Sequence, residues 1–210
     1  EKMPEDLKNA IVAIEDTKFY VHHGIDFWGI GRAMVNNIMK GDLLDQGAST
    51  ITQQLARNAF LTLDKTYFRK IQEAYLAIQF ERLYTKSEIL EMYLNEIFLG
   101  HSAYGVETAS LQYFGKSVEE LTLAESALIA GLPQSPNNYT PLRYPERAIS
   151  RRNVVLDRMH ELGYITEAEM EKAKNAELSL GTVEEREEDI AHYFTLYVRD
   201  QLIDRFGASM

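Results

Sequence analysis

The chain has 210 residues, of which 45% are hydrophobic and 26% are charged, and these are the values of an ordinary globular protein. Its formal net charge of −10 argues against general nucleic-acid binding, because a phosphate backbone needs a basic surface. The absence of cysteine excludes disulfide bonds and thiolate zinc sites. No apolar run approaches the ~20 residues of a transmembrane helix and no signal-peptide pattern is present, so we expect a soluble piece of a longer protein.

Helix starts are the most frequent signal along the chain. An apolar run, residues 10–14, ends at Glu15 and Asp16, and Asp26 is placed to cap a helix that runs to Gly41. Further on, Ser or Thr is followed three residues later by Glu or Gln, a spacing that satisfies free backbone N–H groups at a helix start. These pairs are Thr50 with Gln53, Thr85 with Glu88, Ser117 with Glu120, Thr122 with Glu125, and Thr166 with Glu169.

Apolar periodicity also predicts helices. Spacings of three and four over residues 86–98 and 66–84 predict two amphipathic helices, each with one face on a core. The core-facing residues are Ile89, Leu90, Tyr93, Leu94 and Ile97 in the first, and Phe68, Ile71, Tyr75 and Ile78 in the second.

The C-terminal third follows the same pattern after a break. A helix stops at Gly131, and the prolines of residues 132–145 forbid regular helix. Two surface helices come next, over 146–163 and 166–178, and residues 192–207 form an amphipathic segment. No alternating run demands a sheet, so the predicted fold is all-α.

Glu15 and Asp16 have two interpretations. A carboxylate beside apolar neighbours has a raised pKa and can serve as a catalytic base. Alternatively, the two acids end a helix on the surface with Lys18 as a partner. His22 and His23, just before Gly24, are more typical of a turn than of a metal site.

Two further segments could bind an anion. Residues 47–58, "GASTITQQLARN", place Ser49 and Thr50 at a helix start, which suits a phosphate, or they form a plain capping box. Arg69 and Glu73 are spaced for a helical surface pair. The crowding of cations in this acidic chain favours a multiply charged anion instead; the cations are Arg57, Lys65, Arg69 and Lys70. The paired arginines Arg151 and Arg152 are interpreted as structural.

Together these segments resemble the motifs of the peptidoglycan glycosyltransferases, glycosyltransferase family 51, the polymerising domain of class A penicillin-binding proteins. The first motif, E-D-x-x-F-x-x-H-x-G, and the second, G-x-S-T-x-x-Q-Q, are met from Glu15 to Gly24 and from Gly47 to Gln54. The third, R-K-x-x-E, starts at Arg69. The fourth, K-x-x-I-L-E-x-Y-L-N, and the fifth, R-R-x-x-V-L, start at Lys86 and Arg151.

The resemblance implies a lysozyme-like bilobal helical domain with its active cleft between the lobes. Residues 1–160 would form the glycosyltransferase domain, with about 25–46 as a small membrane-proximal lobe. The apolar residues of 25–39, Trp28 and Met34 among them, suit either a membrane contact or a buried helix. Residues 161–210 would lead toward a transpeptidase domain that lies beyond this sequence.

The resemblance also implies an activity and roles. Lipid II would be polymerised into β-1,4 glycan strands, with inversion and release of polyprenyl pyrophosphate. Glu15 would be the general base, and Glu73 would assist departure of the pyrophosphate directly or through a divalent cation. The implied substrate-binding residues are Asp16, Ser49, Thr50, Gln53, Gln54, Arg57, Lys65, Arg69 and Lys70.

The expected partners are lipid II, the lipid-linked glycan chain, the membrane surface and other cell-wall synthesis proteins. The expected cofactor is at most a divalent cation such as Mg²⁺ or Mn²⁺, with no organic group. The expected location is the outer face of the bacterial cytoplasmic membrane. Two rival interpretations are a lysozyme-like glycan hydrolase or lytic enzyme, which also uses paired carboxylates, and a non-catalytic module that binds lipid precursors.

Overall fold

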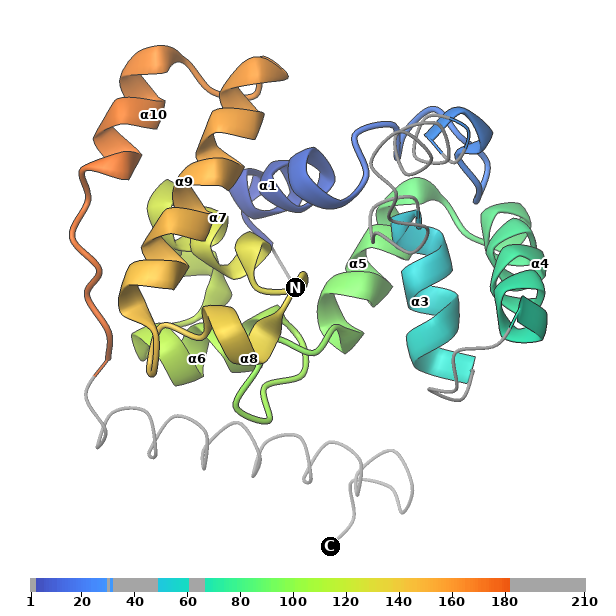
Figure 1. Ribbon diagram of the computed structural model, residues 1–210, viewed down its shortest axis with the longest axis horizontal. Coiled ribbons are helices and arrows are strands. Elements are labelled where there is room, and N and C mark those ends of the chain that lie inside the picture. Colours follow the sequence, from blue (N-terminus) through green and yellow to red (C-terminus); the bar gives the residue numbers. More distant parts are fainter. Residues whose placement is uncertain (1–2, 30, 32–48, 61–66, 182–210) are drawn as a thin grey trace, which may run out of the picture.

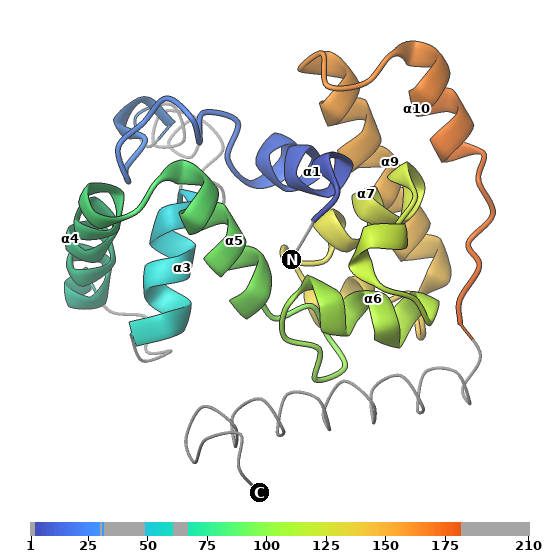
Figure 2. The same ribbon diagram turned by 180° about the vertical axis from the view of Figure 1, so that it is seen from behind.

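The computed structural model describes residues 3–29, 31, 49–60 and 67–181. Figures 1 and 2 show that these residues form helices gathered into two lobes. The described residues contain no β-strand, only an isolated bridge between Phe98 and Tyr104. The prediction of an all-α, bilobal fold is confirmed.

The large lobe is built around α7 (Leu123–Gly131), which is buried on nearly every side. Helices α1 (Glu5–Glu15) and α9 (Pro145–Glu161) pack against α7 and against each other. The lobe is completed by α6 (Val106–Phe114), the 3₁₀-helix η1 (Val118–Glu120), the single turn α8 (Pro136–Tyr139) and α10 (Glu167–Lys174). A helix that is apolar all round must lie in a core, so α7 organises this lobe.

Most of the small lobe predicted over about residues 25–46 lies outside the described residues. In the part that is described, the small lobe consists of three helices that pack on one another: α3 (Ile51–Phe60), α4 (Tyr67–Leu83) and α5 (Lys86–Glu96). Helix α5 also contacts α6, so it connects the small lobe to the large one (Figure 1). Leu90, Tyr93 and Leu94 of α5 belong to the same buried apolar cluster as the core of the large lobe. The two lobes therefore share a continuous core.

Most predicted helix starts are confirmed. Full capping boxes are present at Thr85, Thr122 and Thr166. At Ser117 the side chain accepts from the backbone N–H of Glu119 rather than of Glu120, because the chain turns there into a 3₁₀-helix. Helix α7 ends at Gly131 as predicted. The helix predicted from Asp26 is seen over residues 27–29, and most of its remainder to Gly41 lies outside the described residues, as does the segment 192–207.

Two predictions about packing and one about secondary structure are wrong. The stripe of α4 faces solvent at Phe68, Ile71 and Tyr75, because α4 packs on α3 through its opposite side, where Ala77 is fully buried. Helix α9 is part of the core, since Val155 and Leu156 are inaccessible. The proline-rich stretch 132–145 contains the helical turn α8, because Pro136 occupies its first position, where a missing N–H costs nothing.

Candidate active site

Glu15 is the last residue of α1 and lies where the two lobes meet. Buried residues such as Leu7 and Ile11 anchor α1 in the large lobe, while the Glu15 side chain contacts the small lobe. There the amide nitrogen Nε2 of Gln54, on α3, donates a hydrogen bond of 2.8 Å to Oε2 of Glu15. The carboxylate is partly buried, so it is neither a solvated helix end nor a core residue.

Burial raises the pKa of the Glu15 carboxyl above its ordinary value, and this is the largest influence on it. The hydrogen bond from Gln54 and the positive charges of Arg151 and Arg57 act in the opposite direction, while the neighbouring Asp16 raises the pKa further. A raised pKa lies closer to neutral pH, so the carboxylate can accept a proton and return it under those conditions. Glu15 therefore has the electrostatic environment of a general base.

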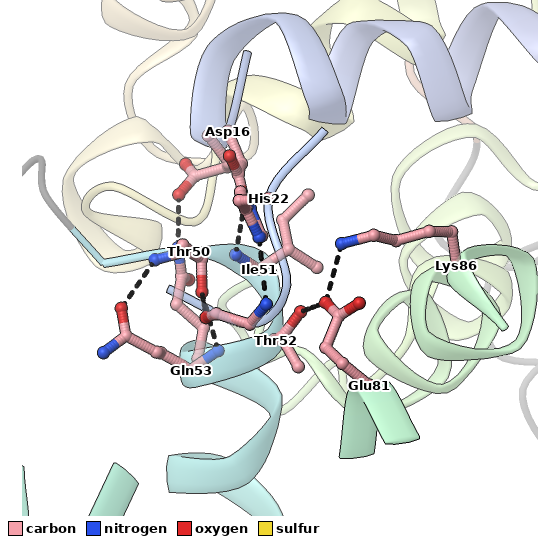
Figure 3. Close-up of polar contacts among 11 residues, drawn as sticks. Asp16, His22, Thr50, Ile51, Thr52, Gln53, Glu81 and Lys86 are labelled. Carbon is pink, nitrogen blue, oxygen red and sulfur yellow. Dashed lines mark hydrogen bonds and ion pairs between the residues drawn. The ribbon is translucent and has the colours of Figure 1, made fainter. Parts of the chain in front are cut away.

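Asp16 is buried and is a hydrogen-bond acceptor within the fold (Figure 3). Its Oδ2 atom accepts hydrogen bonds from the ring nitrogen Nε2 of His22, at 2.8 Å, and from the backbone N–H of Ile51, at 3.0 Å. The backbone N–H of Gly24 donates to Nδ1 of His22 at 3.1 Å, so the ring proton of the neutral imidazole belongs on Nε2. Ile51 is the first residue of α3, where the helix dipole favours a negative charge. Asp16 thus fastens the segment after α1 to the start of α3.

Gly24 lies in this segment at a point of close approach. Its φ angle is +90°, and a Cβ atom there would lie 2.8 Å from the backbone carbonyl of Ala77 in α4. Any other residue would therefore push the loop of residues 17–26, called here the His22 loop, away from the small lobe.

Thr50 and Gln53 form the capping box of α3. The Gln53 side chain accepts from the backbone N–H of Thr50, and Oγ1 of Thr50 accepts from the backbone N–H of Gln53, each at 3.1 Å. The Thr50 hydroxyl also donates a hydrogen bond to the carbonyl of Gly24 at 2.6 Å. Both side chains are buried. Their use within the fold favours a positioning role over the direct substrate contact predicted for them.

The third-motif residues form a second group on α4, in which two cations surround one acid. Glu73 is fully buried, and its Oε2 atom lies 2.8 Å from Nζ of Lys70 while its Oε1 atom lies 3.4 Å from Nε of Arg69. Lys70 also donates to the hydroxyl of Ser49 at 2.7 Å, which links α4 to the start of α3. The predicted pair of Arg69 and Glu73 is present, but it is buried at Glu73 rather than a surface pair.

The described residues form no ready-made cage for a divalent cation. Among them, no three His, Cys, Asp or Glu side chains are gathered at one point. Glu73, the acid that the resemblance associates with a metal, is flanked by the cations Arg69 and Lys70. We therefore assign no step of the reaction to the expected Mg²⁺ or Mn²⁺.

The predicted site residues thus separate into three sets. Gln54 and Arg57 lie with Glu15; Ser49, Arg69 and Lys70 lie with Glu73; and Asp16, Thr50 and Gln53 join α1, α3 and the His22 loop. Lys65 lies outside the described residues.

Two residues of the Glu15 surroundings were not predicted. Arg151, interpreted as structural, acts electrostatically on Glu15 from α9, within the large lobe. Tyr93, predicted as a core residue, donates its hydroxyl proton to Oε1 of Gln54 at 3.2 Å. The signal for Arg151 was its place in a pair of adjacent arginines, which need carboxylate or carbonyl partners. Tyr93 gave no signal, because an apolar stripe does not show which group a buried hydroxyl contacts.

A third network stiffens the small lobe beside the site. Oε1 of Glu81 accepts hydrogen bonds of 2.7 Å from both Thr52 and Lys86 (Figure 3), and Lys86 also lies 4.6 Å from the ring centroid of Phe19. Lys86, the first residue of the fourth motif, therefore holds α3, α4 and α5 in place.

The comparisons with known proteins agree with this geometry. The family model described as Transglycosylase matches residues 1–160. Penicillin-binding protein 1A of Escherichia coli (strain K12) is 46% identical over 209 residues, which is 100% of this chain and 24% of that protein. Penicillin-binding protein 1A of Aquifex aeolicus (strain VF5) is 49% identical over 207 residues, covering 99% and 28%.

A solved structure is also similar. The crystal structure of penicillin-binding protein 1A from Haemophilus influenzae matches with a TM-score of 0.50 and 29% identity, over 99% of this chain and 21% of that one. The chain thus spans about a quarter of the length of the curated relatives that it matches.

A helical bilobal domain with a carboxylate of raised pKa at the lobe junction, and a buried acid among cations nearby, is an enzyme domain of the acid–base type. The chain belongs to the transglycosylase family, the peptidoglycan glycosyltransferases of the class A penicillin-binding proteins. The resemblance inferred from the five motifs is thereby confirmed.

Proposed function

We propose that the domain polymerises lipid II, with Glu15 as the general base. The attacking 4-hydroxyl of the acceptor sugar gives its proton to Glu15 while its oxygen forms a bond to the anomeric carbon of the donor. The bond from that carbon to the pyrophosphate oxygen breaks, and the electron pair leaves with the polyprenyl pyrophosphate. Attack opposite the leaving group inverts the configuration and gives a β-1,4 linkage. The observation that carries the proposal is the partly buried Glu15 carboxylate at the lobe junction, which is held by Gln54 in surroundings that raise its pKa.

The leaving pyrophosphate gains negative charge in the transition state, so cations held in advance lower the barrier. Lys70 and Arg69 are candidates, because Glu73 and the Ser49 hydroxyl already fix their positions. Glu73 then acts on the donor side by orienting these two cations, with no metal required for that task.

The experiment that tests the function distinguishes transfer from hydrolysis. The full chain is incubated with radiolabelled lipid II and, separately, with preformed glycan strands. We expect a ladder of polymers from lipid II and no small muropeptides from the strands. Muropeptides without a ladder would show a glycan hydrolase, and binding of lipid II without any product would show a non-catalytic module.

We also propose that the small lobe contacts the membrane surface that holds the lipid substrate, at the outer face of the bacterial cytoplasmic membrane. Large apolar side chains are exposed on α4, at Phe68 (69%), Ile71 (67%) and Tyr75 (62%), and in the segment that precedes α3, at Trp28 (82%). No helix of the described residues is long and apolar enough to cross a bilayer. Exposed aromatic and aliphatic side chains of this density are typical of an interfacial contact.

Vesicle flotation tests this contact. Phosphatidylcholine vesicles are used, because they carry no net charge and leave apolar contact as the source of binding. The triple variant Phe68→Ser, Ile71→Ser, Tyr75→Ser should lose at least about tenfold in partitioning, since each buried apolar side chain contributes more than about 1 kcal/mol. Val154→Ser with Leu162→Ser, exposed apolar residues of the large lobe, is the matched control. Equal loss in both variants would contradict the proposal.

A further inference from the structure

The hydroxyl of Tyr93 is hydrogen-bonded to Gln54, the residue that holds Glu15. Tyr93, on α5, is fully buried and donates to Oε1 of Gln54 at 3.2 Å. The other end of the same amide donates from Nε2 to Oε2 of Glu15 at 2.8 Å. Three helices, α5, α3 and α1, thus supply one continuous chain of hydrogen bonds that ends on the carboxylate.

The direction of this chain follows from the chemistry of its members. An ionised carboxylate can only accept hydrogen bonds, so it must be met by the NH₂ end of the Gln54 amide. The amide oxygen then points the other way and needs a donor, which the Tyr93 hydroxyl provides. Burial raises the pKa of Tyr93 well above its ordinary value, so the hydroxyl keeps its proton and remains a donor.

The chain of bonds also distinguishes the two oxygens of Glu15. Oε2 receives the hydrogen bond from Gln54. Oε1 accepts no hydrogen bond from the part of the chain that the structure describes, so it is the oxygen left to take a proton. A fixed amide therefore both favours the ionised form of the base and presents one defined oxygen to the acceptor hydroxyl.

We infer that Tyr93 is a positioning residue for the general base: its hydroxyl fixes the Gln54 amide, and that amide fixes and stabilises the ionised Glu15 carboxylate. Tyr93 itself touches no reacting atom. The inference rests on the proposed role of Glu15. It gives a role to Tyr93, a fourth-motif residue that the sequence predicted only as part of the core.

Tyr93→Phe tests the inference, because it keeps the ring and changes no formal charge. Any effect on Glu15 must then pass through the hydroxyl and Gln54. The matched control is Tyr113→Phe, since Tyr113 is also fully buried and donates its hydroxyl to a carbonyl, that of Leu99 at 2.7 Å, in the large lobe. Thermal unfolding of each variant establishes that it folds.

The first measurement is the pKa of Glu15 in the full chain, from the ¹³C resonance of labelled glutamate carboxyls, with the Glu15→Gln variant used to assign the signal. We expect Tyr93→Phe to raise the pKa and Gln54→Met to raise it further. The double variant should equal Gln54→Met alone, because the two residues act in series. Tyr113→Phe should leave the pKa at the wild-type value.

The second measurement is the pH dependence of lipid II polymerisation. Since the base must be ionised, a higher pKa moves the acidic limb of the profile to higher pH. On that limb we expect rates lower by about threefold in Tyr93→Phe and about tenfold in Gln54→Met, in line with losing a hydrogen bond to a charged group. On the alkaline side the rate of Tyr93→Phe should approach that of the wild type.

An unchanged Glu15 pKa in folded Tyr93→Phe, with a rate lowered equally at every pH, would overturn the inference and leave Tyr93 a packing residue. The carboxyl measurement needs no turnover. If the wild-type protein failed to polymerise lipid II while Tyr93→Phe still raised the pKa of Glu15, the proposed function would be refuted. The series of hydrogen bonds from Tyr93 through Gln54 to Glu15 would still stand.

Discussion

At the scale of single residues, Arg151 and Arg152 are neighbours on α9 that have different roles. Arg152 is buried, and its two terminal nitrogens donate to the carbonyls of Ala176 and Lys174, at 2.9 Å and 2.6 Å. It therefore ties the end of α10 to α9. Arg151 donates from Nε to the carbonyl of Gly131 at 3.3 Å, and its charge acts on Glu15. The structural interpretation holds for Arg152 and is incomplete for Arg151.

Replacing each arginine by Met should separate these roles. Arg152→Met leaves two carbonyls without their charged donor, so we expect the free energy of unfolding to fall by about 2–4 kcal/mol, measured by urea titration. Arg151→Met removes a positive charge that lowers the pKa of Glu15, so the acidic limb of the activity profile should move to higher pH.

Each arginine serves as the control for the other in these two measurements. A folded Arg152→Met that shifts the acidic limb, or an Arg151→Met that leaves the limb in place, would contradict the division of roles.

At the scale of elements, local signals predicted the helices well. A capping box depends on residues three apart, so Thr85, Thr122 and Thr166 could be recognised from the sequence alone. The stripe of α5 was also correct, since Ile89, Leu90, Tyr93, Leu94 and Ile97 are all buried.

The errors concern which neighbour a helix meets. Periodicity shows that α4 has an apolar face, but whether that face meets protein, lipid or water depends on contacts distant in sequence. Phe68, Ile71 and Tyr75 are exposed, whereas the acid Glu73 is fully buried on the same helix. Burial of a carboxylate between Arg69 and Lys70 could not be read from a spacing that equally describes a surface pair.

At the scale of the whole molecule, the site exists because α3, a helix of the small lobe, is hydrogen-bonded to the end of α1 in the large lobe. Two hydrogen bonds cross from the end of α1 to α3: Asp16 accepts from Ile51, 35 residues away, and Glu15 accepts from Gln54, 39 residues away. The motifs identified Glu15, Asp16 and Gln54 as functional residues. Their division into a base, an anchor and an amide that orients the base required the fold, because such long-range pairs have no local signature.

The same fold connects chemistry to location. Glu15 lies at the lobe junction, while the exposed apolar residues Trp28, Phe68, Ile71 and Tyr75 all lie outside the large lobe. A lipid-linked substrate held at the membrane could therefore present its sugars to Glu15 and its pyrophosphate to Lys70 and Arg69.

The most direct test of the central claim is the initial rate of lipid II polymerisation by Glu15→Gln. The substituted amide keeps the shape of the side chain and can still accept the hydrogen bond from Gln54, but it cannot take a proton. We expect a loss of at least about a hundredfold in rate with an unchanged unfolding midpoint. The control is Glu96→Gln, because Glu96 is likewise the last residue of its helix but is exposed, and it should retain the wild-type rate. A folded Glu15→Gln variant that polymerises lipid II within about twofold of the wild-type rate would contradict the assignment of Glu15 as the general base.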